Sequence, residues 1–358
     1  MRNYKGIDTD TLNYYPLQDG RVPASSAKMK RLSTLPAERQ SLFQIDKWVK
    51  QTLVHKLQLN TSNRKDMYFS KRKSGPLSFD GELAALYSFI VKHLTEAYPS
   101  FFNSCYDPSR NTLNLHCLLT GEVLTFTNDR KGLYYQHFQE IAESNGLPFG
   151  YPNEYKIHYT RTGFEALAMQ VPEDIVFYAR KNDSDIGEVA WAHLMSPAGW
   201  STEWAIGKSF TEIHAKVKKS DGTPVIKHPP GMINGIMRMK EGVERVGAIS
   251  FRTYFKQDLH PDVEPECSWN FDENQELYIR FERQTVTPFP PLNGFLFTVR
   301  PYYANLLNPK RISKAIEALE NIDDSSYYRN LLEERGTDII AFLKHKKDEY
   351  GRLGFTVE

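Results

Sequence analysis

The chain has 358 residues, a formal net charge of +1 and 25% charged residues, which is typical of a soluble protein with a sizeable core and argues against a nucleic-acid partner. Its three cysteines show no spacing typical of a zinc site or a disulfide framework, which favours a reducing compartment. No apolar run approaches the length of a membrane span and the first residues lack a secretory pattern, so we expect a cytoplasmic protein without a membrane partner.

The N-terminal part of the chain is polar and then basic. Residues 1–36 predict a loosely ordered arm, and residues 38–59 have the pattern of a helix. The segment 63–75 gathers five lysines and arginines with two aromatic residues. This segment is either a nucleic-acid patch or a solvated loop, and the near-neutral charge of the whole chain favours the loop.

Residues 79–98 predict an amphipathic helix. Asp80 is placed to be its N-cap, and Pro99 ends it. Apolar residues recur at helical spacing along it, at Leu83, Leu86, Tyr87, Ile90 and Leu94. The next segment, 113–126, predicts a β-hairpin around Thr120 and Gly121.

The remaining chain mixes strand and helix patterns. The further strands expected are 155–160, 175–179, 189–195 and 248–254. The further helices expected are 133–143, 205–217, 232–246, 309–319 and 326–346. This order predicts an α+β fold built on an antiparallel sheet. We expect an N-terminal arm and helix over 1–78, one domain with C-terminal helices over 79–347, and a tail over 348–358.

The segment 276–303 predicts a second hairpin, in which charged residues accompany apolar strands. Apolar and polar residues alternate over 277–282, and a Pro/Gly-rich turn leads to the apolar run 295–299. The charged residues within or beside these strands are Arg280, Glu282, Arg283 and Arg300. Because a buried charge is costly unless it is paired, they predict either an ion-pair scaffold or the wall of a polar site.

Common catalytic motifs are missing from the sequence. It contains no GxGxxG after a strand, no P-loop, no HExxH and no GxSxG, which excludes the commonest nucleotide, zinc and hydrolase sites. On an ideal helix His214 shares an apolar face with Phe210 and Ile213. It is therefore either a core histidine or an axial ligand of a haem iron.

Two further sets of charges flank strand patterns. Arg252 shares one strand face with Ser250, and this face meets either solvent or a cavity, where the guanidinium would donate to an anion or an oxygen. Glu173 and Asp174 come directly before an apolar strand. We expect this acidic pair at the surface, in a turn or at the start of the strand.

Several of these segments together resemble a known family. In chain order they are Phe164-Glu-Ala-Leu-Ala with Val171-Pro-Glu-Asp174, Ser196-Pro with Trp200, Gly207 and Ile213-His214, Arg280-Phe-Glu-Arg-Gln-Thr285, and Leu296-Phe-Thr-Val-Arg300. Over roughly residues 83–343 the chain is similar to the haem-dependent oxidative N-demethylase α-subunit family.

The resemblance implies a haem-binding PAS-like domain, with an antiparallel sheet, flanking helices and a helical C-terminal tail. It implies haem b as cofactor, dioxygen as oxidant and a small amine or related metabolite as substrate, which is oxidised at an N-methyl carbon. Electrons would come from NADPH through reductase subunits that carry flavin and an iron–sulfur cluster. The chain has neither a dinucleotide fingerprint nor a four-cysteine cluster motif, which agrees with external donors.

The resemblance also implies roles for individual residues. His214 would be the axial ligand of the haem iron, and Arg252 would lie near the distal oxygen site. Glu282 and Arg283 would brace the pocket wall, with Arg252 and Glu282 as the catalytic pair. Arg300 would pair nearby or meet a haem propionate.

Two other functions compete with this enzyme. One is a haem-binding PAS-like sensor without turnover. The other is a haem-free structural member of the family, in which the four charged residues of the second hairpin form only a structural network.

Overall fold

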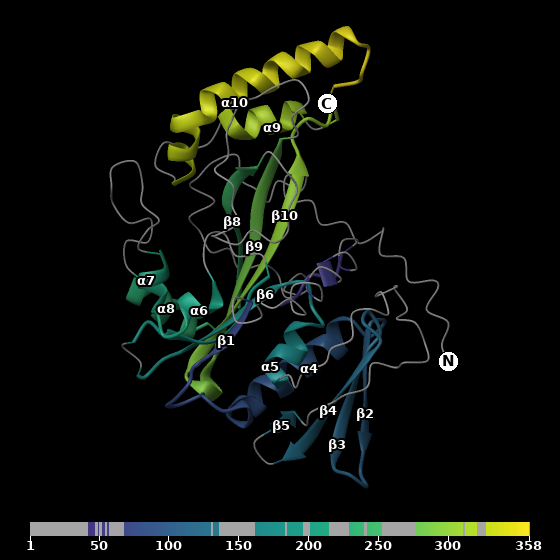
Figure 1. The fold of residues 1–358 in the computed structure, drawn as a ribbon, viewed down its shortest axis with the longest axis vertical. Helices are drawn as coiled ribbons and strands as arrows, with labels where there is room; N and C mark the ends of the chain where they lie inside the picture. The colour runs from purple at the N-terminus through teal and green to yellow at the C-terminus, as the bar shows by residue number, and fades with distance from the viewer. Residues whose placement is uncertain are drawn as a thin grey trace.

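The computed structural model describes residues 42–46, 49, 52–53, 56, 68–129, 132–135, 162–182, 185–195, 201–214, 229–239, 242–252, 277–310, 312–320 and 327–357. They form two antiparallel sheets together with helices (Figure 1). The predicted α+β class is confirmed, with two sheets in place of one. The predicted arm 1–36 and the predicted strand 155–160 lie outside the described residues, as does most of the predicted helix 38–59.

The larger sheet has the strand order β1-β7-β6-β10-β9-β8, and every neighbouring pair is antiparallel. In this order the strands are β1 (Phe69–Lys71), β7 (Glu188–His193), β6 (Asp174–Ala179), β10 (Gly294–Asn305), β9 (Tyr278–Phe289) and β8 (Val243–Arg252). The long hairpin β9–β10 confirms the one expected over 276–303. Its turn is the 3₁₀ helix η3 (Pro290–Leu292), followed by Asn293 in the left-handed region at φ 44°.

The smaller sheet contains β2 (Phe102–Asp107), β3 (Thr112–Cys117), β4 (Glu122–Asp129) and β5 (Gly132–Tyr135), in that order. The hairpin expected over 113–126 is confirmed as β3–β4, with Gly121 at φ 79° in its turn. The start of the helix expected over 133–143 is wrong, because residues 133–135 pair with β4 instead. The rest of that segment lies outside the described residues.

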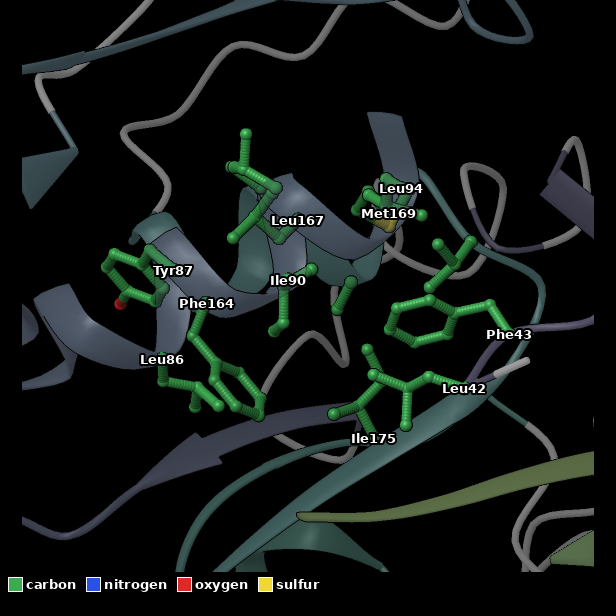
Figure 2. Close-up of a cluster of buried hydrophobic side chains, with 14 of the residues drawn as sticks. Leu42, Phe43, Leu86, Tyr87, Ile90, Leu94, Phe164, Leu167, Met169 and Ile175 are labelled. Carbon is green, nitrogen blue, oxygen red and sulfur yellow. The ribbon is translucent and has the colours of Figure 1, made fainter. Parts of the chain in front are cut away.

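One face of the larger sheet, here called the α4 face, packs against α4 (Ala84–Ala97) and α5 (Gly163–Ala168). The predicted amphipathic helix is thus confirmed, with the 3₁₀ helix η2 (Asp80–Leu83) before it. Figure 2 shows Leu42 and Phe43 beside α4, α5 and Ile175 of β6 in this core. Asp80 is not the N-cap: its carboxylate accepts hydrogen bonds from the Tyr87 hydroxyl and the Gly163 N–H.

The opposite face, here called the α8 face, packs against α6 (Thr202–Ala205), α7 (Phe210–His214) and α8 (Pro229–Met237). The helix expected over 205–217 is interrupted, because Gly207 adopts φ 80° after α6 and α7 begins only at Phe210. The helix expected over 232–246 ends at Met237, and the chain has already entered β8 at Val243.

Two helices complete the described chain. α9 (Ile312–Glu320) and α10 (Tyr327–Arg352) confirm the helical C-terminal part. They lie beyond the end of β8, β9 and β10 that is opposite the β9–β10 turn (Figure 1). They are linked by an ion pair between Lys344 and Glu320 at 2.6 Å. Within the described part of the chain, no helix combines the length and apolar character needed to cross a membrane.

Part of the basic segment 63–75 is ordered into the larger sheet. The expectation of a solvated loop is wrong for residues 69–71, which form β1 and pair with β7. The Lys71 ammonium donates to the Ser78 carbonyl oxygen and lies 5.3 Å from the centre of the Trp191 ring. The cation is therefore used within the fold.

Candidate functional site

A row of charged side chains crosses three neighbouring strands on the α4 face of the larger sheet. Glu173 directly precedes β6, Arg300 lies on β10, and Arg283 is the register partner of Arg300 on β9. We call these three residues the charged row. Their exposures are 0%, 2% and 1%, so three ionisable side chains lie in the interior of the fold. The burial expected for Arg283 and Arg300 is confirmed, and Glu282 is also buried.

An N-terminal segment covers the charged row and supplies partners for it. We call the described residues of this segment, 42–46, 49, 52–53 and 56, the strap. The Arg300 guanidinium donates to the Asp46 carboxylate at 3.1 Å and to the Thr52 hydroxyl at 2.9 Å. The Tyr302 hydroxyl donates to the second Asp46 oxygen at 2.8 Å. Arg300 and Asp46 therefore form a buried, hydrogen-bonded ion pair of the kind that is costly to break from one side.

Lys56 fixes the other end of the strap. Its side chain is fully buried, and its ammonium donates to the carbonyl oxygens of Ala168, Val171 and Glu173 at 2.9, 2.8 and 2.5 Å. Ala168 is the last residue of α5, where carbonyl groups without helical partners favour a cation. Burial lowers the pKa of Lys56 to about 8, against the attraction of the carboxylates of Asp174 and Glu173.

Glu173 supplies the carboxyl group of the charged row and has no exposed surface. Its Oε1 accepts a hydrogen bond from the Gln44 N–H of the strap at 2.6 Å. Burial raises its pKa to about 7, although Arg300 and Arg283 pull in the opposite direction. The expected surface position of Glu173 and Asp174 is wrong, since their exposures are 0% and 2%. The strap covers Glu173, and the Asp174 carboxylate accepts a hydrogen bond from the Met195 N–H at 2.6 Å.

The other sequence candidates lie on the opposite face of the sheet. Successive residues of a strand point to opposite faces, so Glu282 faces away from the charged row that contains Arg283. Glu282 instead accepts a hydrogen bond from the Gln284 side-chain amide at 2.7 Å, and both are buried on the α8 face. The sheet therefore separates Glu282 from Arg283 and Arg300 rather than gathering these three predicted charges.

The backbone positions of His214 and Arg252 lie near different ends of the larger sheet. His214 ends α7, whose Phe210 packs on the stacked rings of Tyr178 and Phe295. Phe295 is the register partner of Pro288, whereas Arg252 pairs with Tyr278, ten residues farther along β9. At about 3.3 Å per strand residue this separation is about 33 Å along the sheet. The backbone does not bring these two positions together (Figure 1).

The surroundings of α7 suit a flat apolar cofactor. Half-buried apolar side chains pack against the α8-face core there, namely Ile186, Trp204, Ile206, Ile213, Met232, Met237 and Met239. A haem needs one axial ligand and apolar walls, and α7 supplies a histidine position among such walls. Among the described residues there is no cluster of three or more His, Cys, Asp or Glu that would hold a bare metal ion.

Sequence reasoning missed the residues that complete the charged row. Asp46, Thr52 and Lys56 lie in a segment interpreted only as a helix, and Tyr302 drew no attention. Their partners are between 112 and 256 positions away in the chain. The one available signal was the isolated charge at the end of the apolar run 295–299, which required a distant carboxylate.

Comparison with known proteins identifies the family. The chain belongs to the family described as haem-dependent oxidative N-demethylase, alpha subunit-like, whose model matches residues 33–335. The match confirms the resemblance found in the sequence and also includes the strap. No curated protein matches the chain.

Proposed function

From this family membership we propose that the chain is the haem-binding subunit of an oxidoreductase that uses dioxygen to N-demethylate a small amine or a related metabolite. The observation that carries the proposal is the family match over residues 33–335, which spans most of the chain. We further propose that the larger sheet and its helices are a PAS-like, haem b-binding domain. The antiparallel order of the sheet and its helix-covered faces support this assignment.

We propose that the haem lies on the α8 face beside α7, with His214 as the ligand of the iron. Two observations support this side of the sheet. The α4 face is filled by helix side chains and the strap, whereas the α8 face presents half-buried Trp204, Ile213 and Met237 around α7. When bound, the haem would supply the activation of dioxygen. The residues of this chain would hold its ring and limit access of water.

The charged residues divide between two tasks in this proposal. Arg283 and Arg300 belong to the α4 face, where Glu173 and the strap are their partners, so we propose a structural role for them. Glu282 on β9 and Arg252 on β8 would act as a catalytic pair only at a haem near the Arg252 end of the larger sheet, and not at the proposed haem beside α7. A pocket that includes them would lie at the end of the α8 face distant from α7.

Electrons must reach the haem from outside this chain. The alpha-subunit-like description of the family agrees with a multi-subunit enzyme. We propose reductase partners that carry NADPH-derived electrons through flavin and an iron–sulfur cluster. Oxidation of an N-methyl group with one dioxygen would consume two electrons and two protons and release the demethylated amine, formaldehyde and water.

A spectroscopic comparison of two variants tests the proposal. The purified, haem-reconstituted protein is expected to show a stoichiometric Soret band that shifts with dithionite and with carbon monoxide. His214→Ala should lose haem or change its ligation. Arg252→Ala should leave the carbon monoxide complex unchanged, because its backbone position is about 33 Å along the strand from the α7 end.

The opposite pattern has a definite meaning. If Arg252→Ala shifts the carbon monoxide spectrum and His214→Ala does not, the haem lies at the Arg252 end of the face and the ligand assignment fails. No Soret band after reconstitution would overturn the oxidoreductase proposal and favour a haem-free member of the family.

A further inference from the structure

We propose that Glu173 is a proton-controlled latch for the strap, which holds the strap on the sheet while its carboxyl group is neutral and loosens it when the proton leaves. Position supports this role. The side chain of Glu173 binds the Gln44 N–H near the start of the strap, and its carbonyl oxygen binds the Lys56 ammonium at the end. One residue thus contacts the strap near both ends.

The surroundings of Glu173 favour a neutral carboxyl group. The residue has no exposed surface, and its Oε1 has one hydrogen bond, from Gln44. Among the described residues no hydrogen bond reaches its Oε2. The Arg283 guanidinium approaches only to 3.9 Å, which is too far for a hydrogen bond. A buried carboxylate with so few donors is poorly stabilised, and protonation removes this cost.

Lifting of the strap would expose Glu173 to water and release its proton. The pKa of this carboxyl is about 7 in the closed state, against an ordinary value of 4.5. A group whose pKa is raised in the closed state stabilises that state at low pH and loses this effect as pH rises through 7. From this group alone, the equilibrium constant for lifting rises about tenfold between pH 6 and pH 8.

Two other groups that face the latch titrate in the opposite sense. Burial lowers the pKa of Lys56 to about 8 and that of His93, whose ring accepts the Leu42 N–H of the strap, to about 4. Both bind protons more tightly once the strap lifts, so they oppose lifting as pH rises. Between pH 6 and pH 8, Lys56 alone lowers the equilibrium constant for lifting about twofold, and His93 alone lowers it about fourfold.

The pH dependence of strap lifting in the wild type therefore combines opposing contributions. A variant is needed to isolate the contribution of Glu173. The remaining charged groups that act on this residue are Arg283 and Arg300, of which Arg300 is paired with Asp46 of the strap. Asp174 acts on Lys56 instead. Glu173→Gln is a neutral isostere that keeps the acceptor for the Gln44 N–H. We expect this variant to hold the strap on the sheet at every pH between 6 and 8.

Hydrogen–deuterium exchange of the full chain, read by mass spectrometry from pH 6 to pH 8 and corrected for intrinsic rates, measures lifting of the strap. The ratio of opening in wild type to opening in Glu173→Gln is expected to rise about tenfold over this range. Glu188→Gln is the control, since Glu188 pairs with Arg72 and Lys181 at the surface. Its ratio to wild type should not change with pH.

Three results would overturn the latch. The first is a wild-type to Glu173→Gln ratio that stays constant with pH. The second is exchange of the strap at the same rate as β10, which would mean that the strap opens only when the whole protein unfolds. The third is failure of Glu173→Gln to fold at pH 8, because the neutral side chain is the one that the proposal requires in the closed state.

Discussion

At the scale of single residues, the molecule stabilises charge inside a core by distributing it over segments that are distant in sequence. Arg300 has its carboxylate partner in Asp46, 254 positions earlier, and its guanidinium lies 5.3 Å from the centre of the Tyr302 ring. Such a pair contributes little net stability relative to apolar residues, but it strongly disfavours the loss of one partner. The geometry therefore specifies where the strap docks.

Removal of one partner of this pair is expected to be costly. Asp46→Asn leaves the shape of the site unchanged and leaves the Arg300 charge buried without a carboxylate. We expect the free energy of unfolding to fall by roughly 3–5 kcal/mol, measured by urea denaturation. Glu320→Gln, which breaks the exposed pair with Lys344, is the matched control and should cost at most about 1 kcal/mol. Equal effects of the two variants would show that the Asp46 pair is not energetically special.

At the scale of elements, the β9–β10 hairpin lies between β6 and β8 and pairs with both strands. Its turn permits close packing, because Gly294 has no side chain where the chain passes the Tyr178 carbonyl oxygen and the Phe177 ring. An added Cβ would overlap both groups. The hairpin is thus held against β6 at its turn and by the charged row at its middle.

Two glycine substitutions test this close packing. Gly294→Ala should destabilise the fold by at least about 1–3 kcal/mol, because backbone and ring atoms must move. Gly351→Ala, near the end of α10, meets no atom within 4 Å and should stabilise slightly, by up to about 1 kcal/mol. Thermal unfolding of both variants checks the prediction, and an unchanged melting temperature for Gly294→Ala would contradict it.

Some of these elements and contacts could be predicted from the sequence alone, and others could not. The alternation over 277–282 and the prolines of the turn predicted the hairpin, because these signals are local. The family resemblance nevertheless implied a shared role for Glu282 and Arg283, although adjacent strand residues point to opposite faces. The partners of Arg283 could not be predicted, since Glu173 reaches it only through the strand order β6-β10-β9. The distance between His214 and Arg252 likewise depends on the register of the sheet.

At the scale of the whole molecule, the strap belongs to the core rather than to an N-terminal arm. Its Leu42, Phe43, Ile45, Val49 and Leu53 are 6% exposed or less and pack in the same cluster as α4 and α5. The family match from residue 33 also includes this segment. A domain that begins at residue 79 therefore lacks part of its own core.

Truncation distinguishes a core segment from an appendage. Deletion of residues 1–32, which precede the family match, should leave a cooperative thermal transition. Deletion of residues 1–56 removes the five apolar side chains and leaves Arg300 without Asp46, so a transition at a much lower temperature is expected. A cooperative transition at the same temperature for both deletions would contradict the role of the strap.

The place of the strap in the chain has a consequence for biosynthesis. The ribosome makes Asp46 early, but its partner Arg300 follows 254 residues later. At about 5–20 residues per second this interval lasts roughly 13–50 s. During that time the charged row that binds the strap is incomplete, and contacts between such distant residues form slowly. The nascent chain is therefore expected to need chaperone protection near its N-terminus until β10 has been made.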